Sequence, residues 1–306
     1  APPVGEALKV DRKEARARRR RVEDIEGFVV WSSNRNGQHD ILRLSLPDLK
    51  VQRLTDHPHV ETYPRISPDG QRVVFARGRE PWVSQRRDKP WDVHLLDLDS
   101  GEERLVAEWG FTPSWSADGT RVYFQRNTGT VVEHELASGR ERVLFAAGSN
   151  GVPARVTLQT PSVHPDGRLA AALRGARRIT GIFSPDGKVV KVGGGDTCQL
   201  NWSSDYTYLC HVGHGGRGKN RVYYVDPGTA ASKSWLDLPD PYSHEYFPRT
   251  SNDGRYLVLG AAAEGHEHDT ADYEIFLWEI GTPETDVVRL TYHTGNDCWP
   301  DMWVEK

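Results

Sequence analysis

The sequence predicts an all-β fold, a single six-bladed β-propeller closed by its own C-terminal strand. Three observations predict it: a short phrase recurs every 39 to 52 residues, strand-like segments lie between its copies, and the last copy supplies a strand that the start of the chain lacks. We expect the propeller to cover residues 25–306. An N-terminal extension with a short basic helix, residues 1–24, precedes it.

The recurring phrase combines an inner strand with a tight turn. Residues before the turn are aromatic or β-branched, and Asp-Gly favours a hairpin because glycine readily adopts positive φ. Periods of roughly 40–50 residues with strand-like content are typical of propeller blades. The copies are YPRISPDG from Tyr63, TPSWSADG from Thr112, TPSVHPDG from Thr160, QLNWSSDY from Gln199, FPRTSNDG from Phe247 and the truncated WPDMW from Trp299.

Three more strand-like runs follow each turn. In the first complete unit they are RVVFAR at 72–77, DVHLLDLD from Asp92 and then ERLVAE. These apolar or alternating runs favour strands. With the inner strand of the phrase, each repeat unit therefore contains four strands.

The two ends of the chain complement each other. The first strand-like runs, FVVWSS at 28–33, DILRLSL at 40–46 and VQRLT at 51–55, correspond to strands two, three and four of a blade. The segment from Trp299 supplies the missing inner strand. We therefore expect the C-terminus to complete the first blade, which leaves no exposed sheet edge.

The segments WSSNRNGQHDILRLSL, QRLT and YPRISPDGQRVVFAR resemble the repeat of TolB-type propellers, which is related to the WD-repeat architecture. The resemblance covers roughly residues 25 to 306. The fifth blade departs from it, with SSDY at 203–206 in place of SPDG. This repeat serves translocation proteins, peptidase accessory domains and some lyases, so the resemblance implies the fold and not the chemistry.

Composition narrows the class of protein. Charged residues make up 27% and hydrophobic residues 37%, a globular balance, and no run approaches the ~20 apolar residues of a membrane span. The net charge of -4 argues against nucleic acid as the main partner. The chain starts at Ala1 without a methionine, so we expect a processed protein that is periplasmic or secreted.

Cys198 and Cys298 form a disulfide in an oxidising compartment, or all three cysteines stay independent thiols.

The segment 11–26 reads as a short helix with Asp11 as its N-cap. Its basic run from Arg18 to Arg21 would suit an acidic surface or anionic lipid headgroups. The alternative is a solvated helix that Glu14 and nearby acidic residues partly neutralise.

Histidines gather in the loops expected on one face of the ring. Four fall between strand four and the next inner strand, five fall in or beside the connections of strands two and three, and only His94, His134 and His164 are expected within strands. This clustering makes the loop face a candidate for function. The histidines between strand four and the next inner strand are His57, His59, His244 and His293. Those in or beside the connections of strands two and three are His39, His211, His214, His266 and His268.

Residues just ahead of the inner strands should point at the mouth of the central tunnel. The candidate ligand-binding residues among them are His59, Glu61, Gln199, His244, Glu245 and Asp297, and the glycine-rich loop at 211–220 adds His214 and Arg217. Imidazole, thiolate and carboxylate groups are the ligands of divalent transition metals such as Zn, Mn or Cu. The candidate metal ligands are His59, Cys198, His244 and Cys298. The alternative is a polar, water-filled mouth.

A second candidate metal site lies in the loop GHEHDTADYE. Its oxygen-rich sequence suits Ca and its imidazoles suit Zn, although the spacing of a calcium hand is absent. The alternative is a solvated acidic loop. The residues concerned are His266, His268, Asp269 and Asp272.

Two functions fit these observations. The first is an extracytoplasmic binding propeller that presents the histidine-rich face to a protein or carbohydrate partner. The second is a metal-dependent enzyme at the tunnel mouth, because oligogalacturonate lyases have a similar repeat with a metal held by histidines and a glutamine. That resemblance implies His59, His244 and Gln199 as metal ligands, and Arg217 or Lys219 would neutralise a uronate carboxylate.

Overall fold

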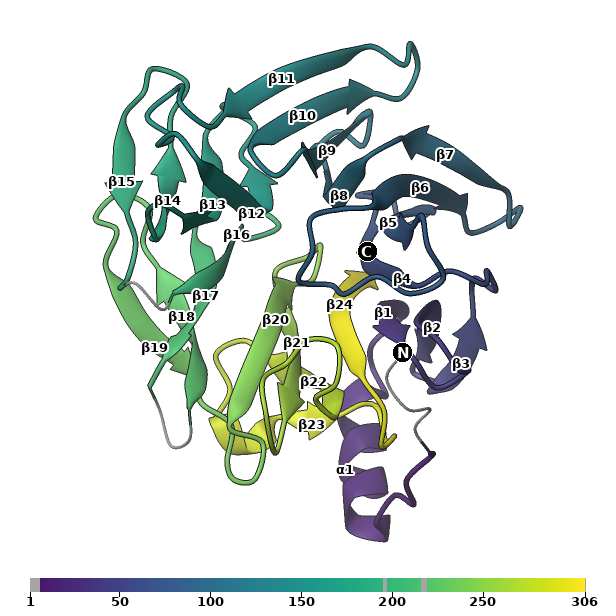
Figure 1. Ribbon diagram of the computed structural model, residues 1–306. Helices are drawn as coiled ribbons and strands as arrows, with labels where there is room; N and C mark the ends of the chain where they lie inside the picture. Colours follow the sequence, from purple (N-terminus) through teal and green to yellow (C-terminus); the bar gives the residue numbers. More distant parts are fainter. Residues whose placement is uncertain (1–5, 195–196, 216–218, 306) are drawn as a thin grey trace.

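A computed structural model describes residues 6–194, 197–215 and 219–305 of the chain. Six four-stranded antiparallel sheets are arranged as blades around a central axis (Figure 1). In each blade the strands follow one another from the tunnel outward. The predicted six-bladed β-propeller is confirmed.

The inner strands of the blades carry the recurring phrase. The strands of the first three blades are β24 (Asp297–Val304), β1 (Gly27–Ser33), β2 (Asp40–Leu46) and β3 (Lys50–Arg53); β4 (Glu61–Ile66), β5 (Arg72–Gly78), β6 (Trp91–Asp97) and β7 (Glu103–Ala107); and β8 (Gly110–Trp115), β9 (Arg121–Arg126), β10 (Thr130–Glu135) and β11 (Glu141–Ala146).

The same order holds in the other half of the ring. The strands of blades four to six are β12 (Val156–Val163), β13 (Leu169–Gly175), β14 (Ile179–Phe183) and β15 (Val189–Lys191); β16 (Cys198–Trp202), β17 (Leu209–His214), β18 (Asn220–Val225) and β19 (Ser232–Leu236); and β20 (His244–Thr250), β21 (Tyr256–Ala262), β22 (Tyr273–Glu279) and β23 (Val288–Arg289), with a 3-10 turn, η1 (Glu284–Asp286), before β23.

Strand β24 closes the ring as predicted. It pairs antiparallel with β1, with Gly27 opposite Val304 and Ser33 opposite Asp297. The first blade therefore contains both ends of the propeller, and its inner edge is paired rather than exposed.

All six inner strands share one irregularity. Their pairing shifts register at the start of the phrase, which is a β-bulge. At each bulge one non-glycine residue has a left-handed backbone, with φ between 46° and 60°. Proline follows it in five blades and Leu200 in the fifth blade. The six residues, which we call the bulge ring, are Tyr63, Thr112, Thr160, Gln199, Phe247 and Trp299.

A buried polar arrangement recurs in two blades. The hydroxyl of Thr55 accepts the N–H of Ile41 at 2.9 Å and donates to Glu61. In the last blade Thr291 accepts the N–H of Ile275 at 2.9 Å and donates to Glu274 at 2.6 Å. Arginines pair with the two carboxylates, Arg77 with Glu61 and Arg289 with Glu274. The RLT sequence at the end of a blade thus ties that blade to a buried carboxylate.

The N-terminal helix α1 (Arg12–Val22) begins at the predicted N-cap. The Asp11 carboxylate accepts the N–H groups of Lys13 and Glu14. The helix docks on the sixth blade: Arg18 donates to the carbonyl of Leu290 at 2.9 Å, and Arg21 pairs with Glu279 and Asp286. With 11 mostly charged residues, it is too short and too polar to cross a bilayer, and no other helix of the described chain is longer.

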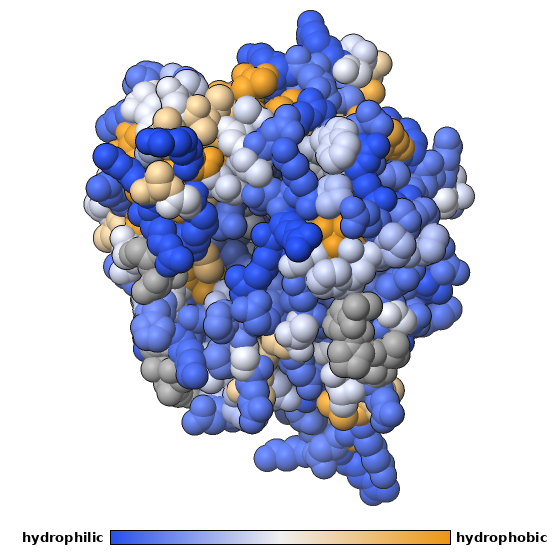
Figure 2. All heavy atoms as spheres, viewed as in Figure 1, coloured by the Kyte–Doolittle hydropathy of each residue, from blue (hydrophilic) through white to orange (hydrophobic). Residues whose placement is uncertain are grey.

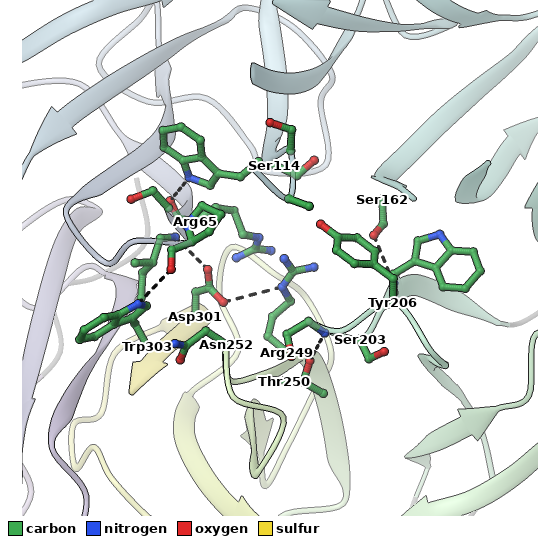
Figure 3. A pocket seen from close by; sticks show the side chains of 18 of the residues that line it. Arg65, Ser114, Ser162, Ser203, Tyr206, Arg249, Thr250, Asn252, Asp301 and Trp303 are labelled. Carbon is green, nitrogen blue, oxygen red and sulfur yellow. Dashed lines mark hydrogen bonds and ion pairs between the residues drawn. The ribbon is translucent and has the colours of Figure 1, made fainter. Parts of the chain in front are cut away.

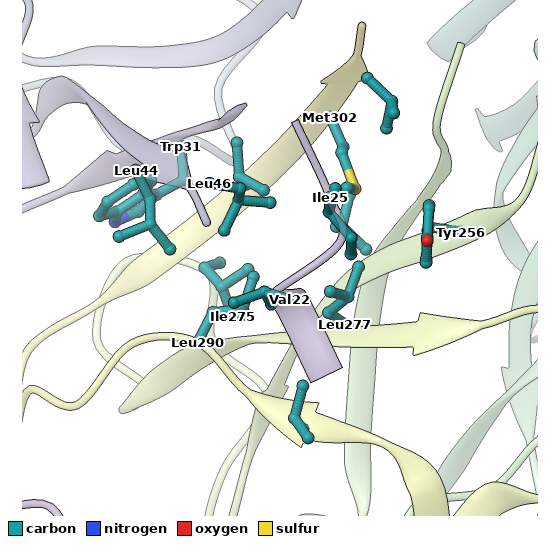
Figure 4. Close-up of a cluster of buried hydrophobic side chains, with 14 of the residues drawn as sticks. Val22, Ile25, Trp31, Leu44, Leu46, Tyr256, Ile275, Leu277, Leu290 and Met302 are labelled. Carbon is teal, nitrogen blue, oxygen red and sulfur yellow. The ribbon is translucent and has the colours of Figure 1, made fainter. Parts of the chain in front are cut away.

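The end of the helix joins a core between the first and sixth blades. Figure 4 shows Val22 and Ile25 among side chains from β1, β2, β21, β22 and β24. Trp31, Leu277 and Met302 are fully or almost fully buried in this cluster. Burial of apolar area at the seam adds to the backbone pairing that closes the ring.

Two details correct or complete the sequence interpretation. His164 does not lie within a strand: it follows β12 and occupies the serine position of the hairpin turn, where its ring packs on Trp202. The three cysteines, Cys198, Cys210 and Cys298, are thiols and form no disulfide.

Candidate ligand-binding cavity at the loop face

A cavity of about 430 Å³ opens among the loops that precede the inner strands. Members of the bulge ring line its floor, and the connections β5–β6, β13–β14 and β21–β22 contribute to its wall. We call it the loop-face cavity. Its aromatic lining consists of Tyr63, Phe111, Tyr246 and Trp299.

Several polar atoms in this lining are buried and lack a hydrogen-bond partner among the described residues. They are the hydroxyls of Thr112 and Thr160, the Oε1 of Gln125 and the Nε2 of Gln199. Unsatisfied buried polar atoms are uncommon and costly, so each calls for a water molecule or a ligand. The set includes donors and acceptors together.

The charged residues of the lining are mostly cationic. The lining contains three arginines, Arg86, Arg174 and Arg178, and one carboxylate, Asp88. Arg86 also pairs with Glu267 at 2.6 Å, and burial raises the pKa of Asp88. The cavity therefore has a positive potential at neutral pH and favours an anionic group.

The β5–β6 connection forms one wall and is anchored to the closing strand. Gln85 Oε1 accepts the indole N–H of Trp299 at 2.5 Å and lies 3.6 Å from the thiol of Cys298. Asp269 accepts the N–H of Gln85 at 2.8 Å and the hydroxyl of Ser84 at 2.5 Å. These contacts fix a long loop over the tunnel, so the wall is pre-formed.

Five of the residues singled out from the sequence reach this cavity. Gln199 belongs to the bulge ring, and its Oε1 accepts the N–H of Phe247 at 2.6 Å. His268 packs edge-on against Trp299, and burial lowers its pKa to about 3, so its ring is neutral at pH 7. The five are Cys198, Gln199, His214, His266 and His268.

Other predicted ligand-binding residues have structural partners outside the cavity. Glu61 is fully buried against Arg77, and Asp297 is paired with Arg35 at 2.6 Å. Glu245 accepts the N–H of Leu238 at 2.6 Å, and burial raises its pKa to about 8. His59 hydrogen-bonds the carbonyl of Gly78 at 2.8 Å. These side chains hold loops and blades in place.

The histidines expected on the loop face are thus divided by burial. Four of them, His39, His211, His244 and His293, are buried rather than displayed. Burial lowers the pKa of His39 and of His211 to about 4. Only His214, His266 and His268 line the loop-face cavity. Arg217, a predicted ligand-binding residue, lies outside the described residues.

The predicted metal ligands are also separated by their contacts. Cys298 is buried beside Gln85, Asp269 holds the β5–β6 connection, Asp272 is exposed, and His244 begins β20. Within residues 6–194, 197–215 and 219–305, no three His, Cys, Asp or Glu side chains converge in a way that would hold a metal ion. In the described parts of the chain the predicted ligands are therefore not gathered into one metal site.

Sequence reasoning missed most of the lining. Gln85, Arg86 and Asp88 come from the long β5–β6 connection, and Arg174 and Arg178 from the fourth blade. The first residue of each phrase was a usable signal, because five of those six residues line the cavity. Figure 2 shows a mostly hydrophilic face with small, separate apolar patches, which favours a polar ligand over a broad apolar contact.

No protein-family model matches the chain. One curated relative, the uncharacterized protein Atu1656 of Agrobacterium fabrum strain C58, is 31% identical over 105 residues, 32% of this chain. The match spans only 36% of that relative's own length.

Comparisons by structure identify the fold. A putative TolB from Agrobacterium tumefaciens matches with a TM-score of 0.58 at 15% identity over 89% of this chain and 92% of that one. An oligogalacturonate lyase in complex with manganese has a TM-score of 0.52 at 18% identity, covering 82% and 71% of the two chains. The oligogalacturonate lyase of Vibrio parahaemolyticus gives 0.51 at 14% identity, covering 86% and 74%. At these identities the likeness concerns the fold alone.

Proposed function

Starting from a chain with the TolB-type six-bladed propeller fold, we propose that it is an extracytoplasmic binding module whose loop-face cavity takes an acidic carbohydrate. The observation that carries the proposal is the mostly cationic lining of the cavity, in which four residues also hold a polar atom without a hydrogen-bond partner among the described residues. A ligand that satisfies these donors and acceptors removes their desolvation penalty.

Sugar hydroxyls suit this set because each one donates and accepts. Thr112 and Thr160 offer hydroxyls, Gln125 offers an acceptor, and Gln199 offers a donor. Tyr246 is a partly exposed aromatic ring in the same lining, a surface on which a sugar ring can pack.

The arginines indicate an acidic sugar. Arg174 donates to the carbonyls of Leu173 and Thr197, each at 3.3 Å, long contacts that a carboxylate would improve on. Galacturonate oligomers are the first ligands to test, because the oligogalacturonate lyases that share this fold act on them by name.

The test is calorimetric titration with galacturonate oligomers and with neutral galactose oligomers of equal length. We expect the acidic oligomers to bind and the Arg174→Gln variant to lose roughly tenfold or more in affinity. Arg255→Gln is the matched control, because Arg255 pairs with Asp253 outside the cavity. Equal binding of neutral and acidic sugars, or of neither, would contradict the proposal.

The same samples test the enzymatic alternative, a uronate lyase. A lyase would release unsaturated products with ultraviolet absorbance, whereas a binding module leaves the oligomers intact. A bound metal ion remains a prediction from the sequence. If the predicted ligands bind a metal ion, elemental analysis should find Zn, Mn, Cu or Ca in a stoichiometric amount. Metal that persists in a His59→Ala, His244→Ala double variant would exclude those two residues as ligands.

A further inference from the structure

The opposite mouth of the tunnel has a different lining. A second cavity, about 280 Å³, lies on the side of the SPDG hairpins (Figure 3). Its lining includes residues that lie two positions after the bulge ring. Five of these six residues line it: Arg65, Ser114, Ser162, Arg249 and Asp301. The sixth, Asn201, accepts a hydrogen bond from Arg249.

Two guanidinium groups face each other across this mouth. Figure 3 shows Arg65 and Arg249 pointing toward one another, with the hydroxyl of Tyr206 directed at the same space. Arg65 is only 7% exposed. Burial and the nearby charge of Arg249 lower its pKa to about 9, so it remains charged at neutral pH.

The lining contains one carboxylate, Asp301, to balance the two arginines, and one of its oxygens accepts a backbone hydrogen bond. Asp301 accepts the N–H of Ile66 at 2.9 Å and lies 3.9 Å from the Nε of Arg249. The lining contains no other charged residue. The mouth therefore carries one excess positive charge in a largely buried position, which is costly without a counter-charge.

The arginine donors are only partly used. Arg65 Nη1 donates to the carbonyl of Pro64 at 2.7 Å, and Arg249 Nη1 donates to Asn201 at 3.0 Å. Arg65 Nε and Nη2 and Arg249 Nη2 have no hydrogen-bond partner in the described parts of the chain. The hydroxyl of Ser114 is likewise buried without a partner.

We propose that the hairpin-face mouth binds a carboxylate group between Arg65 and Arg249. A planar carboxylate matches the guanidinium fork, and Ser114 and Tyr206 can donate to its remaining lone pairs. The cavity is small, which suits a single carboxylate from a free organic acid or from a peptide that inserts one residue. The bulge ring separates this site from the loop-face cavity.

The test uses three probes: acetate, a short peptide with a free C-terminus, and the same peptide amidated. Binding is followed by the Nε–H signals of Arg65 and Arg249 in nitrogen-15 correlated NMR spectra. We expect saturable shifts with acetate or with the free peptide and none with the amidated one. If acetate binds with the same affinity as the free peptide, the site is assigned to small organic acids. If the free peptide binds much more tightly than acetate, the site is assigned to the C-termini of peptides.

Two variants move the affinity in opposite directions. Arg249→Gln removes one guanidinium and should weaken binding about tenfold to a hundredfold. Asp301→Asn keeps an acceptor for Ile66 and removes the competing charge, so it should tighten binding severalfold. Arg255→Gln, on the same blade but outside the mouth, is the control.

Several results would overturn this site. They are no saturable shift with either carboxylate probe, an equal response to chloride, or affinities that do not change in Arg249→Gln and Asp301→Asn. The outcome is independent of the proposed carbohydrate site, because Arg174→Gln should leave carboxylate binding at the hairpin face unchanged.

Discussion

The rings of Tyr63 and Trp299 stack with their centroids 3.7 Å apart and an angle of 28° between their planes. Tyr63 begins the phrase of the second blade, and Trp299 begins that of the strand that closes the first. The contact therefore joins two blades at the bulge ring. Phe247 of the sixth blade also packs against Trp299, with a centroid distance of 4.1 Å.

Truncation of Trp299 should destabilise the closed ring. Trp299→Ala removes a side chain that is 2% exposed, and we expect a loss of about 3–5 kcal/mol in the free energy of unfolding. Trp109→Ala is a matched control, because Trp109 has almost the same φ, 55° against 56°, and is 45% exposed. It should cost less than about 1 kcal/mol. Urea unfolding measures the free energy of unfolding of both variants. Equal losses in the two would contradict a role for Trp299 in stabilising the closed ring.

The threonines of the RLT sequences should each contribute through their hydroxyl. Thr55→Val and Thr291→Val leave a backbone N–H and one oxygen of a buried carboxylate without a partner, at about 2–4 kcal/mol each, while the arginine still holds the other oxygen. The serine variants retain the hydroxyl and should lose about 1 kcal/mol. Chemical denaturation separates the two series, and valine variants as stable as the serine variants would argue against the arrangement.

Buried histidines should make the protein sensitive to acid. His39 and His211 have pKa values of about 4 in the folded chain because burial disfavours their charged form, against 6.5 when unfolded. The unfolded state binds more protons below pH 6.5, so stability falls between about pH 6.5 and pH 4, by up to about 3 kcal/mol per histidine. A His39→Gln, His211→Gln variant should have a flatter stability profile over this range. A profile parallel to that of the parent would contradict the assignment.

Glu245 should produce the opposite slope. Burial, with a smaller effect of Asp237, raises its pKa to about 8 in the folded chain, above the ordinary 4.5. The folded state holds this proton while the unfolded state releases it, so the contribution of Glu245 to stability falls as pH rises from about 4.5 to about 8. Glu245→Gln keeps an acceptor for the N–H of Leu238 and should remove this slope. Urea unfolding at pH 5 and pH 8 checks it, and an unchanged slope would show that Glu245 is ionised when folded.

The sequence predicted the blades because their signals are local. Asp-Gly turns and alternating runs mark the strands, and the missing inner strand near Phe28 matched the extra one near Trp299. The cavities were harder to predict because they combine residues from several blades. Glu61 and Asp297 are the first residues of inner strands, where the sequence predicted tunnel residues, yet arginines elsewhere in the chain pair with them.

The residues that line the hairpin-face mouth could have been predicted from the sequence. The third residue of each phrase, such as Arg65 or Asp301, occupies the tunnel in register with its counterparts. Interpreting the phrase as strand and turn alone overlooked this, because an ideal strand alternates sides and a bulge changes which side chains face inward. The shift in pairing beside Tyr63 is a tertiary feature that local patterns do not report.

The repeated left-handed residue also bears on how such a scaffold can diversify. In five blades the left-handed residue itself lines the loop-face cavity, and in five blades the residue two positions later lines the hairpin-face mouth. Charge at one opening can consequently change in unit steps, one substitution at a time, while the other opening keeps its chemistry. A designer seeking a two-ended receptor would have five such positions in the lining at each end.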